Sequence, residues 1–562
     1  MKRRSPSRRL SRNEVTAGLG VAAVLSLLVV FLLVPLGTLL SMSLEDRAGT
    51  FVGLANFKRY LSSPQLVLSA GNSALVALIT VAIVVPLAFV FAYALTRTRV
   101  PFRGLLQAAA LLPLFAPSLL PAISLVYLFG QQGLLKNALP GTLYGPTGIV
   151  LAESLYTFPQ ALLVLVTALR LADARLYDAA ASLGASRWRR FRTVTWPGAK
   201  YGAVSAAFVV FTLVVTDFGI PKVIGGRFNV LATDAYKQVV GQQDLPMGAV
   251  VGTLLLVPAA AAFAVERWVA RRSVAVMTAR AVPLAPKRDA WRDRALGLYC
   301  ALVSGAICGT FAVAVWASFV RYFPYDTTLT VAHYDFASAD PVGWASFANS
   351  LVVATMTAVA GTAMVFLGAY LARKLRVAPR ARTALSLVAM VPMAVPGLVL
   401  GLSFLLFLSK PWNPLRGLYG TLVVLAICTI IHFYTVAHLS AVTALQAIDD
   451  EFETVGSSLG VAWWRTFWRV TVPISMPAIL DVGTYFFVSA MTTVSAVIFL
   501  YEPSTKLAAV TVVHLDEMGA TAPAAAVASL LLATSLAAKG LKLVLERLVH
   551  RRQARWRGGL EA

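Results

Sequence analysis

The sequence predicts an all-α membrane protein with about twelve transmembrane helices, arranged as two parallel six-helix repeats. Hydrophobic residues make up 58% of the 562 residues and charged residues 13%, with a mean hydropathy of +0.75, which excludes an ordinary soluble globule. The apolar stretches are long and continuous, whereas the strands of a membrane barrel would alternate apolar and polar residues. A set of residues also recurs about 276 positions later in the chain.

Each predicted helix is an apolar run of about 20 residues or more, the length that crosses a bilayer. The run that opens the chain is longer than the apolar part of a secretory signal, which predicts a retained first helix. The predicted spans are 17–42, 68–95, 104–130, 147–169, 198–220 and 246–268 in the first half, and 295–320, 345–372, 383–408, 418–445, 475–500 and 520–545 in the second.

The net charge of +24 follows the predicted topology and does not indicate a nucleic-acid partner. Lys and Arg gather in alternate loops and at both ends, whereas the loops between them, such as 43–67 and 323–344, are poorer in them and hold acids. This pattern predicts a multi-pass membrane protein with both termini in the cytoplasm. The basic segments are 2–12, 97–103, 170–200, 267–294, 373–382, 465–469 and 539–557.

The recurring residues indicate an internal duplication. Features of the first half return in the same order and with the same predicted sidedness, so the repeats should be parallel and related by an axis along the membrane normal. The predicted organisation is a cytoplasmic tail (1–14), a first repeat (15–270), a cytoplasmic linker (271–294), a second repeat (295–545) and a second cytoplasmic tail (546–562). The matched pairs include Asn72 with Asn349, Pro113 with Pro392, Pro117 with Pro396 and Phe158 with Phe433.

Two basic loops, which we call the first repeat loop (170–197) and the second repeat loop (446–473), carry the clearest match. The first contains DAAASLGASRWRRFRTVTWP and the second TVGSSLGVAWWRTFWRVTVP, with Gly184 opposite Gly460 and Pro197 opposite Pro473. In the first, a short helix should end at the glycine and a basic segment should lead to the proline that closes the loop. A duplicated basic loop predicts two docking sites for a two-fold partner.

These loops resemble the EAA loops of ATP-binding-cassette import permeases, in which E-A-A is followed after three residues by Gly and later by Pro. The first copy reads Asp178-Ala179-Ala180 and keeps Gly184 and Pro197. The second departs further. Thr454, Val455 and Gly456 stand at the triplet, with Glu453 one residue early, while Gly460 and Pro473 are kept.

Over nearly its full length the chain resembles fused type I import permeases, and most closely those for 2-aminoethylphosphonate, on residues 216–243, 449–473 and 493–526. Ferric-iron and thiamine permeases are related, and a polyamine permease is a further alternative. The resemblance implies a non-catalytic subunit in the bacterial inner membrane that contacts a cytoplasmic ATPase dimer and a periplasmic or lipid-anchored substrate-binding protein. It also implies alternating access, in which closure of the ATPase dimer moves the loops and reorients the path for a small-molecule substrate.

Polar residues inside the predicted spans are candidates for that substrate path, because an ionisable group in the bilayer is costly unless it meets water or a partner. Asp217 is the acid singled out, and the open alternatives are a place near the interface or a pairing with Lys222. The candidates are Asn72, Thr216, Asp217, Asn349, Thr492, Thr493 and Ser495.

The sequence contains no phosphate-binding loop, catalytic triad or zinc motif, so we expect no catalytic residue, metal or cofactor, and ATP hydrolysis by a separate subunit. Cys300, Cys308 and Cys428 fall inside predicted spans and indicate packing residues. An ion-coupled secondary transporter is the rival class. It should carry several charges at mid-membrane depth and would need no docking loops.

Overall fold

The computed structural model describes residues 12–558 except 172, 275–281, 283, 287 and 376–377. Helices dominate the described residues, because the apolar runs satisfy their own backbone groups only as helices. The helices of the first half are α1 (Arg12–Leu28), α2 (Val34–Ser43), α3 (Ala55–Leu61), α4 (Pro64–Arg97), α5 (Arg103–Ala110), α6 (Leu119–Phe129), α7 (Pro146–Arg170), α8 (Ala174–Ser182), α9 (Arg187–Arg190), α10 (Trp196–Thr216), α11 (Gly219–Ile224), α12 (Leu231–Tyr236) and α13 (Leu245–Val274).

The second half repeats this order, with an antiparallel hairpin after its first helix that the sequence did not predict. The hairpin consists of β1 (Val320–Tyr322) and β2 (Asp326–Leu329). The helices are α14 (Ala290–Ala317), α15 (Phe336–Ala339), α16 (Trp344–Met356), α17 (Thr362–Arg373), α18 (Pro379–Val388), α19 (Gly397–Ser409), α20 (Leu422–Gln446), α21 (Glu451–Ser458), α22 (Trp463–Thr466), α23 (Val472–Ile474), α24 (Met476–Thr492), α25 (Ala508–Glu517) and α26 (Thr521–Gly558).

The all-α membrane class is confirmed, but two predicted spans are not straight helices. Within the described residues, nine helices are long and apolar enough to cross a membrane, or eleven if each bent pair counts as one span. The predicted span 383–408 is a helix pair bent by 110°, and the span 104–130 consists of α5, a short turn and the 11-residue α6. The repeated prolines Pro113, Pro117, Pro392 and Pro396 lie at these breaks, because proline has no backbone N–H to continue a helix.

Equivalent hydrogen bonds make the duplication visible at the level of single atoms. Ser73 Oγ accepts from Leu231 N at 2.8 Å, and Ser350 Oγ accepts from Ala508 N at 2.8 Å. Each bond joins the first part of a long outer helix to the segment that follows the broken helix of the same repeat. The two bonds bridge the same separation of 158 residues, so the repeats share their internal contacts as well as their order of elements.

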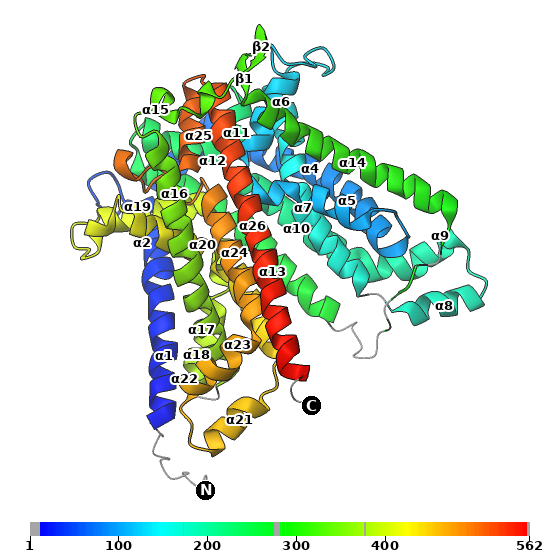
Figure 1. Ribbon diagram of the computed structural model, residues 1–562. Coiled ribbons are helices and arrows are strands. Elements are labelled where there is room, and N and C mark those ends of the chain that lie inside the picture. The colour runs from blue at the N-terminus through cyan, green and yellow to red at the C-terminus, as the bar shows by residue number, and fades with distance from the viewer. Residues whose placement is uncertain are drawn as a thin grey trace.

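The first helices of the two repeats are exchanged (Figure 1). α1 packs on α17 and α18 of the second repeat, while α14 packs on α4, α5 and α6 of the first. Side chains secure both contacts. Gly20 of α1 leaves room for Leu371, and Tyr299 OH of α14 donates to Leu87 O at 2.7 Å. Each bundle of helices therefore contains one helix that belongs to the other repeat in sequence.

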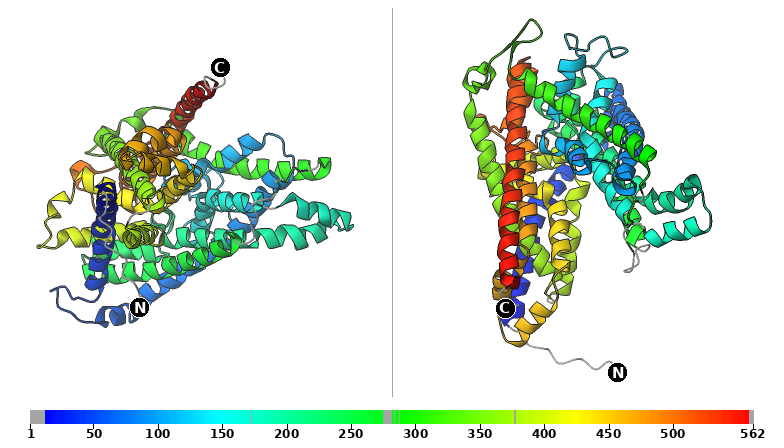
Figure 2. Two further views of the ribbon diagram at one scale, coloured as in Figure 1. Left: turned by 90° about the horizontal axis from the view of Figure 1, so that it is seen from below. Right: turned by 45° about the vertical axis from the view of Figure 1, so that its right-hand side comes forward.

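The two bundles meet near the β1–β2 hairpin and diverge toward the opposite end (Figures 1 and 2). Both described chain ends and the helices α8 and α21 lie toward this divergent end, with α8 on one bundle and α21 on the other. The two repeat loops are thus placed on separate bundles, where a movement between the bundles would change the distance between the loops.

Candidate functional site

Both repeat loops contain a helix that ends at a glycine and is followed by a second short helix. α8 ends before Gly184 and α21 before Gly460, whose φ angles are +68° and +71°. Ala185 N donates back to Ala180 O at 3.0 Å, and Val461 N donates to Gly456 O at 2.8 Å. This is the usual closure of a helix by a left-handed residue. The prediction that Gly184 ends the helix is confirmed.

The two loops expose large apolar side chains at equivalent positions. Leu183 is 84% exposed and Leu459 75% exposed, each one residue before its glycine. Neither α8 nor α21 has a buried residue. Exposed apolar groups that are rimmed by charge are typical of a surface that binds another protein. The exposed apolar pairs, each 276 residues apart, are Leu176 with Phe452, Leu183 with Leu459 and Trp188 with Trp464.

A buried cation anchors the start of each loop. Lys374 has a side chain only 1% exposed, and its Nζ lies 2.5 Å from Asp450 Oδ1 and 2.6 Å from Ile448 O. Its equivalent, Arg97, donates from Nη2 to Leu169 O at 2.5 Å and lies 5.3 Å from the centre of the Tyr177 ring. Each cation satisfies a carbonyl at the end of a membrane helix, which fixes the direction in which the loop leaves it.

The residues at the E-A-A positions of the two repeat loops are only partly alike. Asp178 and Ala179 are exposed and Ala180 is half-buried, whereas Glu453 points inward and Thr454 is exposed. Glu453 Oε1 accepts a hydrogen bond from Thr471 Oγ1 at 3.4 Å. At the equivalent position of the first repeat loop, Tyr177 OH forms a hydrogen bond of 2.9 Å with Thr195 Oγ1. Glu453 is thus the equivalent of Tyr177 rather than of Asp178.

Gly456 allows a close approach within the second repeat loop. A Cβ at Gly456 would lie 2.9 Å from Thr466 Oγ1, so glycine lets α21 approach α22 closely. The equivalent position in the first repeat loop is Ala180. The two loops therefore have the same arrangement of short helices, although different residues pack within them.

The closing prolines do not end the loops as expected. Pro197 lies in the first turn of α10, and the helical run of which it is part begins at Arg187, ten residues before the proline. A π-helical turn, Phe191–Thr195, directly precedes α10 and interrupts the regular hydrogen-bond ladder, so a residue without a backbone N–H is tolerated there. Pro473 lies in α23, and the segment Trp463–Ile474 bends by 81° from Met476–Thr492. The second loop therefore enters its membrane helix through a sharp bend.

Thr216, Asp217 and Thr492, which are among the residues predicted along the path, lie where α10 and α24 end. The hydroxyls of Thr216 and Thr492 each donate a hydrogen bond to the backbone carbonyl of the residue four positions earlier in the same helix. Asp217 Oδ2 accepts from Ile220 N at 2.8 Å and so caps α11. The suggested pairing of Asp217 with Lys222 is wrong, because Lys222 Nζ lies 2.5 Å from Glu517 Oε1.

The other predicted path residues have structural contacts of their own. Asn72 Nδ2 donates to Asn229 O at 2.9 Å, and Asn349 Nδ2 donates to Ser504 O at 2.9 Å. Thr493 is buried directly after α24. Ser495 Oγ lies 2.6 Å from where a Cβ at Gly397 would be, so the hydroxyl sits against the broken α18–α19 pair. The two asparagines hold outer segments, while Thr493 and Ser495 lie beside the helix breaks.

Glu153 is a second acid that the sequence reading overlooked. It lies in the middle of α7 with no exposed surface, and neither carboxyl oxygen has a hydrogen-bond partner among the described residues. Asp217 is close enough to act on it electrostatically. The signal was present, since Glu153 is the single acid in the predicted span 147–169. The inner part of the first repeat therefore holds two carboxyl groups instead of one.

The described residues contain no group of three or more His, Cys, Asp or Glu side chains that could hold a metal ion. Cys300 and Cys428 are buried and Cys308 is half-buried, without disulfides. Two helical repeats with paired exposed loops, and polar residues beside broken membrane helices, are the arrangement of a membrane permease.

The comparison with known families agrees with this class. The chain belongs to the family described as the binding-protein-dependent transport system inner membrane component, whose model matches it twice, at residues 84–274 and 364–551. Members of this family are non-catalytic subunits that work in general with an ATPase and a substrate-binding protein. The two matched segments correspond to the two repeats.

The chain is also similar to several permease proteins of known name. The chain is 26% identical to the ferric transport system permease protein FbpB of Actinobacillus pleuropneumoniae, over 81% of this chain and 68% of that protein. It is 29% identical to the thiamine transport system permease protein ThiP of Brucella abortus, over 34% of this chain and 36% of that protein. A probable sulfate transport system permease protein cysT of Nephroselmis olivacea is 27% identical over 42% of this chain and 83% of that protein.

Proposed function

We propose that the chain is the transmembrane subunit of an ATP-driven importer, with a cytoplasmic ATPase dimer docked on the two repeat loops. The observation that carries this proposal is the pair of exposed apolar loops at equivalent positions, one on each bundle. Both chain ends face the cytoplasm in this arrangement, because the Lys- and Arg-rich segments lie on the side of the loops.

The substrate that we propose is 2-aminoethylphosphonate, carried inward. Residues 216–243, 449–473 and 493–526 support it by resemblance. The carboxyl groups of Asp217 and Glu153 suit an ammonium group, while hydroxyls such as those of Thr493 and Ser495 suit a phosphonate. The second candidate is ferric iron, because two ferric transport permeases align over 81% and 75% of this chain. A bare ferric ion would want several oxygen anions together, and the described residues hold no such group.

Growth on 2-aminoethylphosphonate as sole phosphorus source tests the substrate. A deletion strain should fail to grow, and the wild-type gene should restore growth. Asp217→Asn and Glu153→Gln should each lower the initial uptake rate about tenfold, because a charge-assisted contact is lost. Asp335→Asn, which alters an exposed acid of the outer loop, is the matched control.

Normal growth of the deletion strain, in a host without another uptake route, would rule out this substrate. Loss of growth under iron limitation instead would favour the ferric candidate. Unchanged uptake by both acid variants would remove only the role given to Asp217 and Glu153.

A separate prediction tests the loops. Gly184→Val should reduce ATP-coupled uptake strongly, because a β-branched residue at φ +68° costs about 1–3 kcal/mol and tilts α8 away from its docked position. Gly184→Asn should keep most activity, since asparagine tolerates this conformation. A Cβ at Gly184 would meet nothing within 4 Å, so steric clash cannot explain a difference between the two variants. If Gly184→Val and Gly184→Asn supported equal uptake at matched expression, the positive φ angle of residue 184 would not be what the loop requires.

A further inference from the structure

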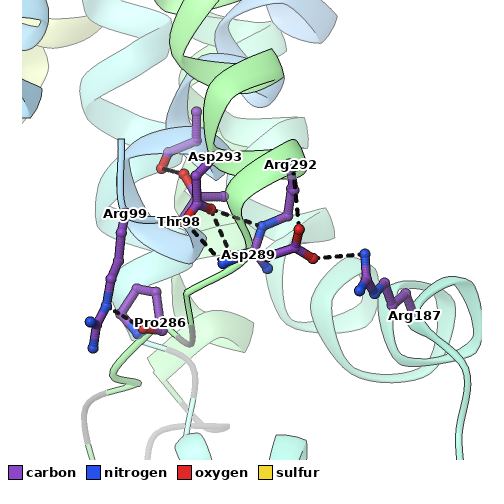
Figure 3. Close-up of polar contacts among 8 residues, drawn as sticks. Thr98, Arg99, Arg187, Pro286, Asp289, Arg292 and Asp293 are labelled. Atoms are coloured by element: carbon purple, nitrogen blue, oxygen red, sulfur yellow. Dashed lines mark hydrogen bonds and ion pairs between the residues drawn. The ribbon is translucent and has the colours of Figure 1, made fainter. Parts of the chain in front are cut away.

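The start of α14 contacts the first repeat loop (Figure 3). Arg187 Nη1, at the beginning of α9, lies 2.8 Å from Oδ2 of Asp289, the residue that precedes α14. The other oxygen of Asp289 accepts a hydrogen bond from Arg292 N and caps α14. A single carboxylate therefore joins the first turn of α14 to the first repeat loop.

Residues that lead into α14 contact the same region. Val282 O accepts from Ala174 N at 2.9 Å, at the first residue of α8. Pro286 O accepts from Arg99 Nε at 2.8 Å, just after α4 (Figure 3). Val282 and Asp289 thus contact the first repeat loop, and Pro286 contacts the residues that follow α4, so these three residues do more than connect the two repeats.

The second repeat loop has an equivalent contact with the start of α1. Asn13 Nδ2 donates to Val461 O at 3.4 Å, and Trp463 Nε1 donates to Thr16 Oγ1 at 3.1 Å. Asn13 and Asp289 are 276 residues apart, and so are Arg187 and Trp463. The two contacts thus occupy the same place in the two repeats, with an ion pair in one and neutral hydrogen bonds in the other.

We propose that these contacts are crossed braces, in which the first helix of each repeat holds the repeat loop of the other repeat. Asp289 and Asn13 are the positioning residues. Each brace fastens the loop end of an exchanged helix to the bundle on which that helix packs. When closure of the ATPase dimer displaces a loop, the exchanged helix moves with the bundle on which it packs. It does not move with the other helices of the repeat to which it belongs in sequence. α14 carries this movement from the first repeat loop to the β1–β2 hairpin that follows it.

The proximity of the paired residues can be tested on the membrane-inserted chain alone. In a background with Cys300, Cys308 and Cys428 replaced by alanine, Arg187→Cys with Asp289→Cys should cross-link through a short bis-maleimide. Asn13→Cys with Val461→Cys should also cross-link. The exchanged pairings, residue 187 with 13 and residue 461 with 289, should not. Cross-linking of the exchanged pairings, or of no pairing, would overturn the braces.

The positioning role rests on the proposed function and needs a second measurement in the assembled importer. Asp289→Arg and Arg187→Asp should each lower the ATPase stimulation by about threefold, a modest effect because Arg187 is 78% exposed. The double variant restores an opposite-charge pair but not the cap on Arg292 N, so it should recover the part of the loss that is due to the ion pair and exceed the Asp289→Arg single variant. Arg294→Asp, an exposed change on the same helix, should have no effect.

The two measurements separate the possible failures. The positioning role would be contradicted if the single variants had the ATPase stimulation of the wild type. It would also be contradicted if the double variant lost as much stimulation as the two single variants together. Absence of ATP coupling in the wild-type chain would contradict the proposed function, and the cross-linking pattern would still decide whether the braces exist.

Discussion

A permease carrying Leu183→Asp and Leu459→Asp is expected to lose its ATPase. Both leucines are among the most exposed apolar side chains of the repeat loops, and each lies next to the glycine that ends its helix. The few side chains that dominate an interface contribute about 2 kcal/mol or more each, and the introduced carboxylate adds the cost of burying a charge. Each substitution should therefore weaken binding about thirtyfold. Because both sites act on one ATPase dimer, the double variant should show almost no bound partner.

The measurement is co-purification of the ATPase with a tagged permease, together with its hydrolysis rate. Leu329→Asp is the matched control, since Leu329 is 72% exposed in β2 at the opposite end of the molecule. This control should leave the complex intact. Retention of the ATPase by the double variant, at normal membrane levels, would show that the leucines are not the docking surface.

Lys374→Met is expected to have the second large effect. The ammonium contacts Asp450 Oδ1 at 2.5 Å, Ile448 O at 2.6 Å and Glu453 Oε2 at 4.0 Å. Its removal leaves the Ile448 carbonyl and the largely buried Glu453 carboxyl without a cation, whereas Asp450, whose side chain is 57% exposed, can be hydrated by water. Leaving buried acceptors unpaired in this way typically costs about 1–3 kcal/mol. We expect a lower thermal unfolding temperature and a displaced second repeat loop, with weaker ATPase binding. Lys374→Arg should retain much of the stability and of the ATPase binding, because the positive charge is kept.

The defect of Lys374→Met should shrink as the pH falls. Burial raises the pKa of the Glu453 carboxyl, and the Lys374 ammonium opposes that rise. Without the lysine, the buried carboxyl is best tolerated in its protonated form, so folding is favoured at low pH and loses stability as the pH rises. A variant whose deficit in unfolding temperature stayed constant between pH 8 and pH 5 would contradict this account.

The repeat loops could be predicted from the sequence because their residues recur at a constant offset. Gly184 and Gly460, for example, mark the helix ends without any knowledge of tertiary contacts. The broken spans were harder, since the apolar runs continue across Pro113 and Pro392 and hydropathy alone favours a single helix. Their repetition at the same offset is the signal that each pair of prolines marks a break.

Other parts of the site depend on contacts between distant segments. Glu153 is one acid in an apolar run, and its nearness to Asp217 arises only when α7 packs beside the end of α10. Lys374 looks like an ordinary basic residue at a membrane boundary, and its burial follows from the way the second repeat loop turns back over it. The exchange of α1 and α14 leaves no local pattern, although Asn13 and Asp289 share the common offset.

The exchanged first helix has a consequence for how the protein is made. α1 packs on α17, yet Leu28 and Thr362 are 334 residues apart, so α1 enters the membrane long before its packing partner has been synthesised. At bacterial elongation rates this delay is on the order of half a minute. During that time the face of α1 that includes Gly20 and Val24 must be covered by lipid or by the insertion machinery. Assembly of the first bundle likewise waits for α14, so neither half can mature before the chain passes its midpoint.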